Sequence, residues 1–136
     1  MRIVADTNIL VSAIIRPNGR FARHIRLGKF LLLVSDALLD ELVEVLSRPK
    51  LRTKYNLTPE YIYSFLQLLH SRSEHVDITE SITVCRDEDD DKFLELAVSG
   101  GADVIVTYDT DLLSLHPFRE IPIVKPVDFW SILEQQ

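Results

Sequence analysis

The chain has 136 residues, of which 46% are hydrophobic and 26% charged, a composition typical of a folded globular protein and too apolar for a disordered one. Its 15 basic and 21 acidic residues give a formal net charge of −6. The molecule as a whole is therefore a poor electrostatic partner for nucleic acid, and contact with RNA or DNA would need bound cations or a local basic patch.

Several classes of protein are excluded by features that the sequence lacks. The longest apolar run, residues 30–34, is far shorter than the roughly 20 residues of a membrane span, and Asp6 interrupts the apolar N-terminal segment, which argues against a signal peptide. Cys85 is the only cysteine, so neither an internal disulfide nor a cysteine-based zinc cluster can form. We expect a cytoplasmic protein that does not enter a membrane, with residues 1–136 forming a single domain.

Short apolar segments alternate along the chain with segments of helical character. Strands are expected at residues 2–5, 30–34, 104–106 and 121–124, and a further strand near 82–84. Helices are expected at residues 9–15 (capped by Asn8), 20–27, 36–47 (with Pro49 just beyond its end), 59–71, 87–98 and 127–133. This alternation predicts a three-layer α/β/α sandwich with a mostly parallel central sheet of four or five strands.

Two aspartates come shortly after predicted strands. Asp6 directly follows the first strand, and Asp109 stands three residues after the 104–106 strand, with Asp111 close by. Taken singly, each aspartate could simply form a turn or cap a helix. Because ligands of parallel sheets bind beyond the carboxyl ends of the strands, the two residues are also expected at the edge where chemistry takes place.

Two further acids belong to predicted helices. Glu41 lies at the margin of an apolar helix face, from which its carboxylate can reach the sheet edge, although a surface ion pair would explain it equally well. Asp90 shares the buried face of its helix with Leu94 and Ala97, and Asp89 and Asp91 fall to its sides. Five of the six residues 87–92 are acidic, and their mutual repulsion would be relieved by a bound cation.

Four carboxylates without an accompanying histidine or cysteine would form an all-oxygen site. Such a site suits Mg²⁺ or Mn²⁺ rather than zinc, and its typical chemistry is phosphodiester hydrolysis, in which one ion activates water and another stabilises the leaving oxygen. The acidic cluster is not an EF-hand, because Lys92 and Val98 occupy the positions that require glycine and a bidentate glutamate.

These residues, in this order, resemble the PIN domain. The resemblance is carried by Asp6-Thr7-Asn8, by Glu41, by the segment from Arg86-Asp87 through Asp90-x-Lys92-Phe93-Leu94-Glu95-Leu96-Ala97, and by Thr107-x-Asp109-x-Asp111-Leu112-Leu113. It covers Met1 to about Trp130 and is strongest with the branch that contains the toxin components of prokaryotic toxin–antitoxin systems. Two positions differ from the usual pattern of this branch. Glu88 stands where the branch often has proline, and Tyr108 stands where it frequently has glycine. The tyrosine side chain would narrow the cleft or stack within it.

The resemblance implies a single PIN-like domain that acts as a Mg²⁺- or Mn²⁺-dependent endoribonuclease, dimerises with itself and is held inactive by a cognate antitoxin. The family's acidic quartet matches Asp6, Glu41, Asp90 and Asp109. The three aspartates would ligate metal, and Glu41 would orient the attacking water or hold a second ion. Supporting roles would fall to Thr7, Asn8, Asp87, Thr107 and Asp111.

Basic residues gather in one part of this otherwise acidic chain. Arg16, Arg20 and Arg23 are candidates for RNA contact along the flank of a groove. The same residues would also suit a solvated surface or a contact with an acidic partner.

Two other functions remain open at the level of sequence. A PIN-like domain that binds RNA or a partner protein without catalysis would carry the same fold. A Mg²⁺-dependent phosphoryl-transfer domain also places an aspartate after a strand, but the dehalogenase type needs a second aspartate where Asn8 stands, and the receiver type needs a lysine that Lys125 supplies only loosely.

Overall fold

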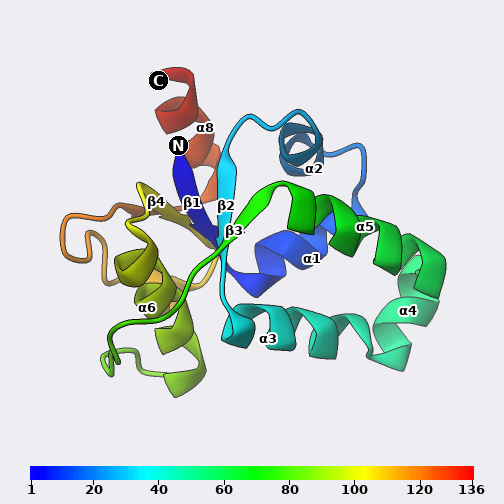
Figure 1. The fold of residues 1–136 in the computed structure, drawn as a ribbon, viewed down its shortest axis with the longest axis horizontal. Helices are drawn as coiled ribbons and strands as arrows, with labels where there is room; N and C mark the ends of the chain where they lie inside the picture. Colours follow the sequence, from blue (N-terminus) through cyan, green and yellow to red (C-terminus); the bar gives the residue numbers. More distant parts are fainter.

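A five-stranded sheet forms the centre of the computed structural model, which covers residues 1–136 (Figure 1). The strands lie in the order β3-β2-β1-β4-β5, and all four neighbouring pairs are parallel. Their bounds are Arg2–Ala5 for β1, Leu31–Val34 for β2, Ser73–His75 for β3, Val104–Val106 for β4 and Ile123–Val124 for β5. The predicted α/β/α fold is thus confirmed, and the carboxyl ends of all five strands share one edge.

Eight helices surround the sheet. They are α1 (Thr7–Ile15), α2 (Arg20–Arg26), α3 (Asp36–Leu46), α4 (Pro49–Tyr55), α5 (Pro59–Ser71), α6 (Asp91–Gly100), α7 (Thr110–Leu113) and α8 (Pro126–Glu134), with a 3-10 turn, η1, at Glu88–Asp90. Figure 1 shows α1, α2 and α5 on one side of the sheet and α6 on the other. None of these helices combines the length and the apolar character needed to cross a lipid bilayer.

The three central strands are buried on both faces. Ile3, Val4 and Ala5 of β1 are at most 1% exposed, and the sequences of β2 and β4 are equally apolar. Strands covered on both faces read as continuous apolar runs, which is why these three were predictable. Asp6 therefore leaves the sheet at its centre, between the ends of β2 and β4.

The prediction of a strand near residues 82–84 is wrong. The fifth strand is β3, which pairs with β2 through the register Leu32↔Ser73, Leu33↔Glu74 and Val34↔His75. β3 lies at the sheet edge with mostly exposed polar side chains, so it has no apolar pattern to reveal it. The last strand is also shorter than predicted, because Ile121 forms an isolated antiparallel bridge with Phe118 instead of joining β5.

One predicted helix start is wrong as well, and one helix was not predicted. The N-cap of α1 is Asp6, whose side chain accepts the N–H of Ile9 at 3.0 Å, so the helix begins at Thr7 and Asn8 lies within its first turn. Pro49 does not merely follow α3 but opens α4. Proline is favourable at the first position of a helix, because the N–H group that it lacks would have no hydrogen-bond partner there. Pro49 can therefore follow α3 and also begin α4.

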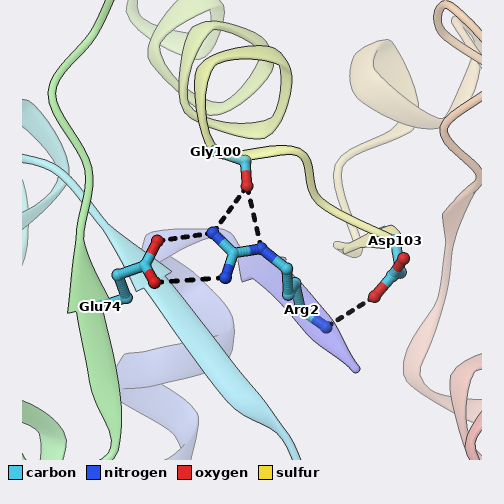
Figure 2. A network of polar contacts seen from close by, with 4 residues as sticks. All are labelled: Arg2, Glu74, Gly100 and Asp103. Atoms are coloured by element: carbon cyan, nitrogen blue, oxygen red, sulfur yellow. Dashed lines mark hydrogen bonds and ion pairs between the residues drawn. The ribbon is translucent and has the colours of Figure 1, made fainter.

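A network around Arg2 ties together three elements at the amino end of β1 (Figure 2). The guanidinium donates to the carboxylate of Glu74 on β3 at 3.2 Å and to the carbonyl of Gly100 at 3.0 Å, while the backbone N–H donates to Asp103 at 2.7 Å. Gly100 ends α6 so close to β2 that a Cβ atom there would lie 2.8 Å from Leu33. This network fixes α6 against the sheet, and α6 carries the acidic segment at its other end.

The start of α6 corrects the predicted orientation of the acidic cluster. Residues 88–90 form the 3-10 turn, and the buried acid is Asp91, at 7% exposure, whereas Asp90 is only partly buried. A 3-10 turn has three residues per turn, so the α-helical spacing from Leu94 does not extend back to Asp90. Burial alone would raise the pKa of Asp91. Its carboxylate, however, accepts hydrogen bonds from the N–H groups of Cys85 (2.8 Å) and Val84 (3.2 Å), and these bonds favour the charged form strongly enough that the pKa is lowered overall.

Replacing Asp91 should therefore weaken the fold. In Asp91→Ala the N–H groups of Val84 and Cys85 lose their acceptor, and we expect the free energy of unfolding to fall by about 1–3 kcal/mol. Urea denaturation followed by circular dichroism measures this change. Asp89→Ala removes an exposed acid from the same segment and should stay within about 0.5 kcal/mol of the wild type; equal losses in the two variants would contradict the structural role of Asp91.

Candidate active site

A cavity of about 210 Å³ lies where the carboxyl ends of β1 and β4 meet α3 and α6. We call it the acidic cavity; its lining comprises Asp6, Thr7, Asn8, Glu41, Val45, Arg48, Asp90, Phe93 and Asp109. The four acids singled out in the sequence thus come together from four separate segments. Two of them follow strands, one belongs to α3, and one ends the 3-10 turn.

Asp6 is the most deeply buried of these acids, at 4% exposure. One carboxylate oxygen accepts the N–H of Ile9, and the other accepts the hydroxyl of Thr107. Burial raises the pKa of Asp6 above its usual value, and the negative charge of Asp109 adds to this effect, whereas the two hydrogen bonds oppose it. The carboxylate is therefore held in a fixed orientation in a place where its negative charge is poorly solvated.

Thr107 links the two strand-end acids. Its fully buried hydroxyl donates to Asp6 and accepts the N–H of Asp109 at 2.9 Å. The side chain of Asp109 in turn accepts the N–H of Asp111 at 2.8 Å and caps α7. Asp111, predicted as a supporting acid, contributes a backbone N–H here, and its carboxylate does not line the cavity.

Glu41 is held from two sides. Its Oε2 atom accepts the hydroxyl of Thr7 and lies 3.3 Å from Nζ of Lys92, whose side chain is only 18% exposed. Arg48 also lines the cavity while its guanidinium pairs with Glu44 at 2.9 Å. Sequence analysis missed Lys92 and Arg48 as parts of the site, although Arg48 stands seven residues after Glu41, close to two helical turns, and Lys92 is embedded in the acidic motif.

Negative charge accumulates most strongly at Asp90. Partial burial, followed by the nearby charge of Asp109 and then those of Asp87 and Asp6, raises the pKa of Asp90 to about 7. Asp87 lies outside the cavity, where its side chain caps the 3-10 turn by accepting the N–H of Asp89 at 3.0 Å. The acids are thus close enough to oppose one another's ionisation.

The carboxylates share a cavity without forming a ready-made ligand shell. No group of three or more histidine, cysteine, aspartate or glutamate side chains in the chain is arranged to hold a metal ion. Their chemistry nevertheless suits a hard divalent cation, because every carboxylate donor is an oxygen and the charges of Asp109, Asp87 and Asp6 add to partial burial in raising the pKa of Asp90. A cation would have to draw the side chains together.

The three predicted RNA-contact arginines separate in the structure. Arg16 and Arg20 line a second cavity of about 170 Å³, and Arg23 lines neither this cavity nor the acidic one. Arg20 is engaged by Glu134, with 2.8 Å between the charged atoms.

The family model described as "PIN domain" matches residues 2–111, which include all four acids of the acidic cavity. The chain therefore belongs to the PIN domain family.

Two known proteins show how the chain relates to others. MJ1680, an uncharacterised protein of Methanocaldococcus jannaschii, is 36% identical over 119 residues, which cover 85% of this chain and 76% of that protein. A chain from the crystal structure of VapBC2 from Rickettsia felis, bound to a DNA fragment from their promoter, superposes with a TM-score of 0.59 and 19% identity over 90% of this chain and 97% of that one. This second similarity is one of fold.

The raised pKa of Asp90 predicts how stability depends on pH. Between the ordinary aspartate pKa of 3.8 and about 7, the folded chain holds a proton at Asp90 that the unfolded chain releases, so this residue's contribution to the free energy of unfolding declines as the pH rises through that window. Asp90→Asn removes the effect. The variant should be more stable than the wild type at pH 8, with a melting temperature higher by on the order of 2–5 °C, since solvent screens the partly exposed group.

Thermal unfolding in EDTA between pH 4 and pH 8 measures the difference. The advantage of Asp90→Asn should shrink toward pH 4, while Asp89→Asn, which alters the exposed neighbour, should follow the wild-type profile. Parallel profiles for the wild type and Asp90→Asn would show that burial and the neighbouring acids do not raise the pKa of Asp90 as described.

Proposed function

We propose that this PIN domain is a divalent-metal-dependent endoribonuclease that hydrolyses RNA phosphodiester bonds and acts as the toxin of a toxin–antitoxin pair. The observation that carries the proposal is the gathering of Asp6, Glu41, Asp90 and Asp109 in one cavity, where burial and then the charges of neighbouring acids raise the pKa of Asp90 to about 7. Family membership supports a nuclease, because PIN domains generally have that activity.

Asp6, Asp90 and Asp109 are the residues that would hold Mg²⁺ or Mn²⁺. When bound, such an ion lowers the pKa of water and stabilises the charge that develops on the transferred phosphate group. The cation would also bridge the RNA backbone to a chain whose net charge is −6.

The surrounding residues orient these acids. Thr107 and the N–H of Ile9 fix both oxygens of Asp6, and the N–H of Asp111 fixes one oxygen of Asp109. Thr7 and Lys92 hold Glu41, which in this proposal orients the water that attacks phosphorus and accepts its proton as the bond to the leaving oxygen breaks.

A regulatory partner follows from the same proposal. The motifs that resemble toxin components, together with the fold shared with the VapBC2 chain, support a cognate antitoxin that holds this protein inactive, and a homodimer as the assembly. The RNA substrate would place the activity in the cytoplasm.

Cleavage should depend on the acidic cavity and on a divalent ion. Asp6→Asn and Glu41→Gln should each slow cleavage of a fluorescently labelled single-stranded RNA by roughly 100-fold or more, because each removes a charge that acts in the transition state. Asp6→Asn should still fold, since asparagine is also a favourable N-cap whose oxygen can accept the N–H of Ile9 while its amide group donates to the Thr107 oxygen. EDTA should abolish wild-type cleavage, and Mn²⁺ should restore it.

Asp40→Asn is the matched control for Glu41→Gln. It alters an exposed acid one residue away on α3 and should cleave like the wild type. Near-normal cleavage by Asp6→Asn, or wild-type cleavage that survives chelation, would refute the proposed site and favour a domain that binds RNA or a partner protein without catalysis.

A further inference from the structure

The second cavity, which Arg16 and Arg20 line, shares two segments of the chain with the acidic cavity. On α1, Asn8 lines the acidic cavity and the next residue, Ile9, lines the second one. After β4, Asp109 lines the acidic cavity and the preceding residue, Tyr108, lines the second one. Consecutive residues of the same two segments therefore line the two cavities.

Tyr108 supplies an aromatic face that has no partner within the chain. Its side chain is 60% exposed and has no aromatic neighbour, whereas Phe21 and Trp130 of the same cavity pack on each other with ring centroids 6.0 Å apart. Trp130 is further covered by the guanidinium of Arg20, 4.4 Å from its ring centroid. Trp130 therefore forms a wall of the cavity, and Tyr108 is the ring free to stack on a ligand.

Arg16 supplies a positive charge that is not neutralised. Its guanidinium takes part in none of the six ion pairs of the chain, in contrast to Arg20, which pairs with Glu134. A free arginine beside an exposed aromatic ring is the combination by which proteins bind single-stranded nucleic acid, the charge contacting the phosphate and the ring contacting a base.

The size of the cavity suits one base. A cavity of about 150 Å³ can hold a benzene ring, and this one has a volume of about 170 Å³ and opens to solvent beside Tyr108. An acidic peptide would also be attracted by Arg16, but the binding of carboxylates does not require the exposed ring of Tyr108.

We propose that the second cavity is a nucleobase subsite, in which an unpaired base of the RNA substrate stacks on Tyr108 while the adjoining phosphate contacts Arg16. This inference rests on the proposed function, because the nucleotide beside the scissile phosphate is the one that would reach the subsite. Every base has a π-face, so the subsite selects single-stranded over paired RNA rather than one sequence over another.

Trp130 offers a direct readout, because it is the only tryptophan of the chain and lies in the wall of the subsite. Titration with a short oligouridylate, in EDTA and again with Ca²⁺, should produce a saturable change in tryptophan fluorescence. Tyr108→Ala should raise the Kd at least about five-fold, the loss expected for one stacked base, and Tyr108→Phe should keep wild-type affinity. Tyr63→Ala, which removes a tyrosine of similar exposure (64%) on α5, is the matched control and should bind normally.

The salt dependence of binding tests the role of Arg16. For Arg16→Gln, the slope of log K against log salt concentration should become shallower by about 0.7, the value for one phosphate contact with a single strand. Lys50→Gln, which removes an exposed positive charge that lines neither cavity, should leave the slope unchanged.

The outcomes separate this inference from the nuclease itself. Equal Kd values for the wild type and Tyr108→Ala, or RNA binding detected by anisotropy without any change in Trp130 fluorescence, would overturn the subsite even if the wild type cleaves RNA. Binding that depends on Tyr108 in a chain that does not cleave would support the subsite and refute the nuclease. A wild-type chain that neither binds nor cleaves RNA would refute both.

Discussion

Four carboxylates from separate segments meet at the carboxyl edge of the sheet, where burial and mutual repulsion oppose their ionisation. Parallel pairing brings the residues after β1 and β4 to the same edge, and α3 and the 3-10 turn add two more acids. The Thr107 hydroxyl, the Ile9 N–H and the Lys92 ammonium group offset part of this crowding, yet burial and the remaining repulsion raise the pKa of Asp90 to about 7. Such residual repulsion is what a divalent cation neutralises.

In two segments, one residue stabilises the fold while a close neighbour in the sequence faces a cavity. Asp91 is buried and accepts two backbone N–H groups, so it anchors the segment before α6, while Asp90 one residue earlier faces the acidic cavity. The same division occurs after β4, where Thr107 is fully buried, Asp109 faces the acidic cavity and Tyr108 faces the second cavity. At the far end of β1, the Arg2 network holds α6 in the position that makes this arrangement possible.

Elements of the fold could be predicted from the sequence where burial produces a run of apolar residues. They could not be predicted where the local backbone geometry, rather than burial, determines the position of a residue. The apolar runs of β1, β2 and β4 revealed the parallel sheet, and with it the positions of Asp6 and Asp109. β3 has no apolar pattern because it is an exposed edge strand with polar side chains. The orientation of Asp90 and Asp91 differs from the predicted one because a 3-10 turn precedes α6. Lys92 and Arg48 were overlooked because their approach to Glu41 depends on how α3 and α6 pack.

A crystal structure of the chain soaked in Mn²⁺, with the ion located by its anomalous scattering, tests the account most directly. We predict an anomalous peak between the carboxylates of Asp6, Asp90 and Asp109, which will have moved closer to one another than in the metal-free chain. Manganese bound only elsewhere, or a cavity that stays empty while the Asp90 side chain turns toward solvent, would contradict the claim that these acids are assembled to hold a divalent cation.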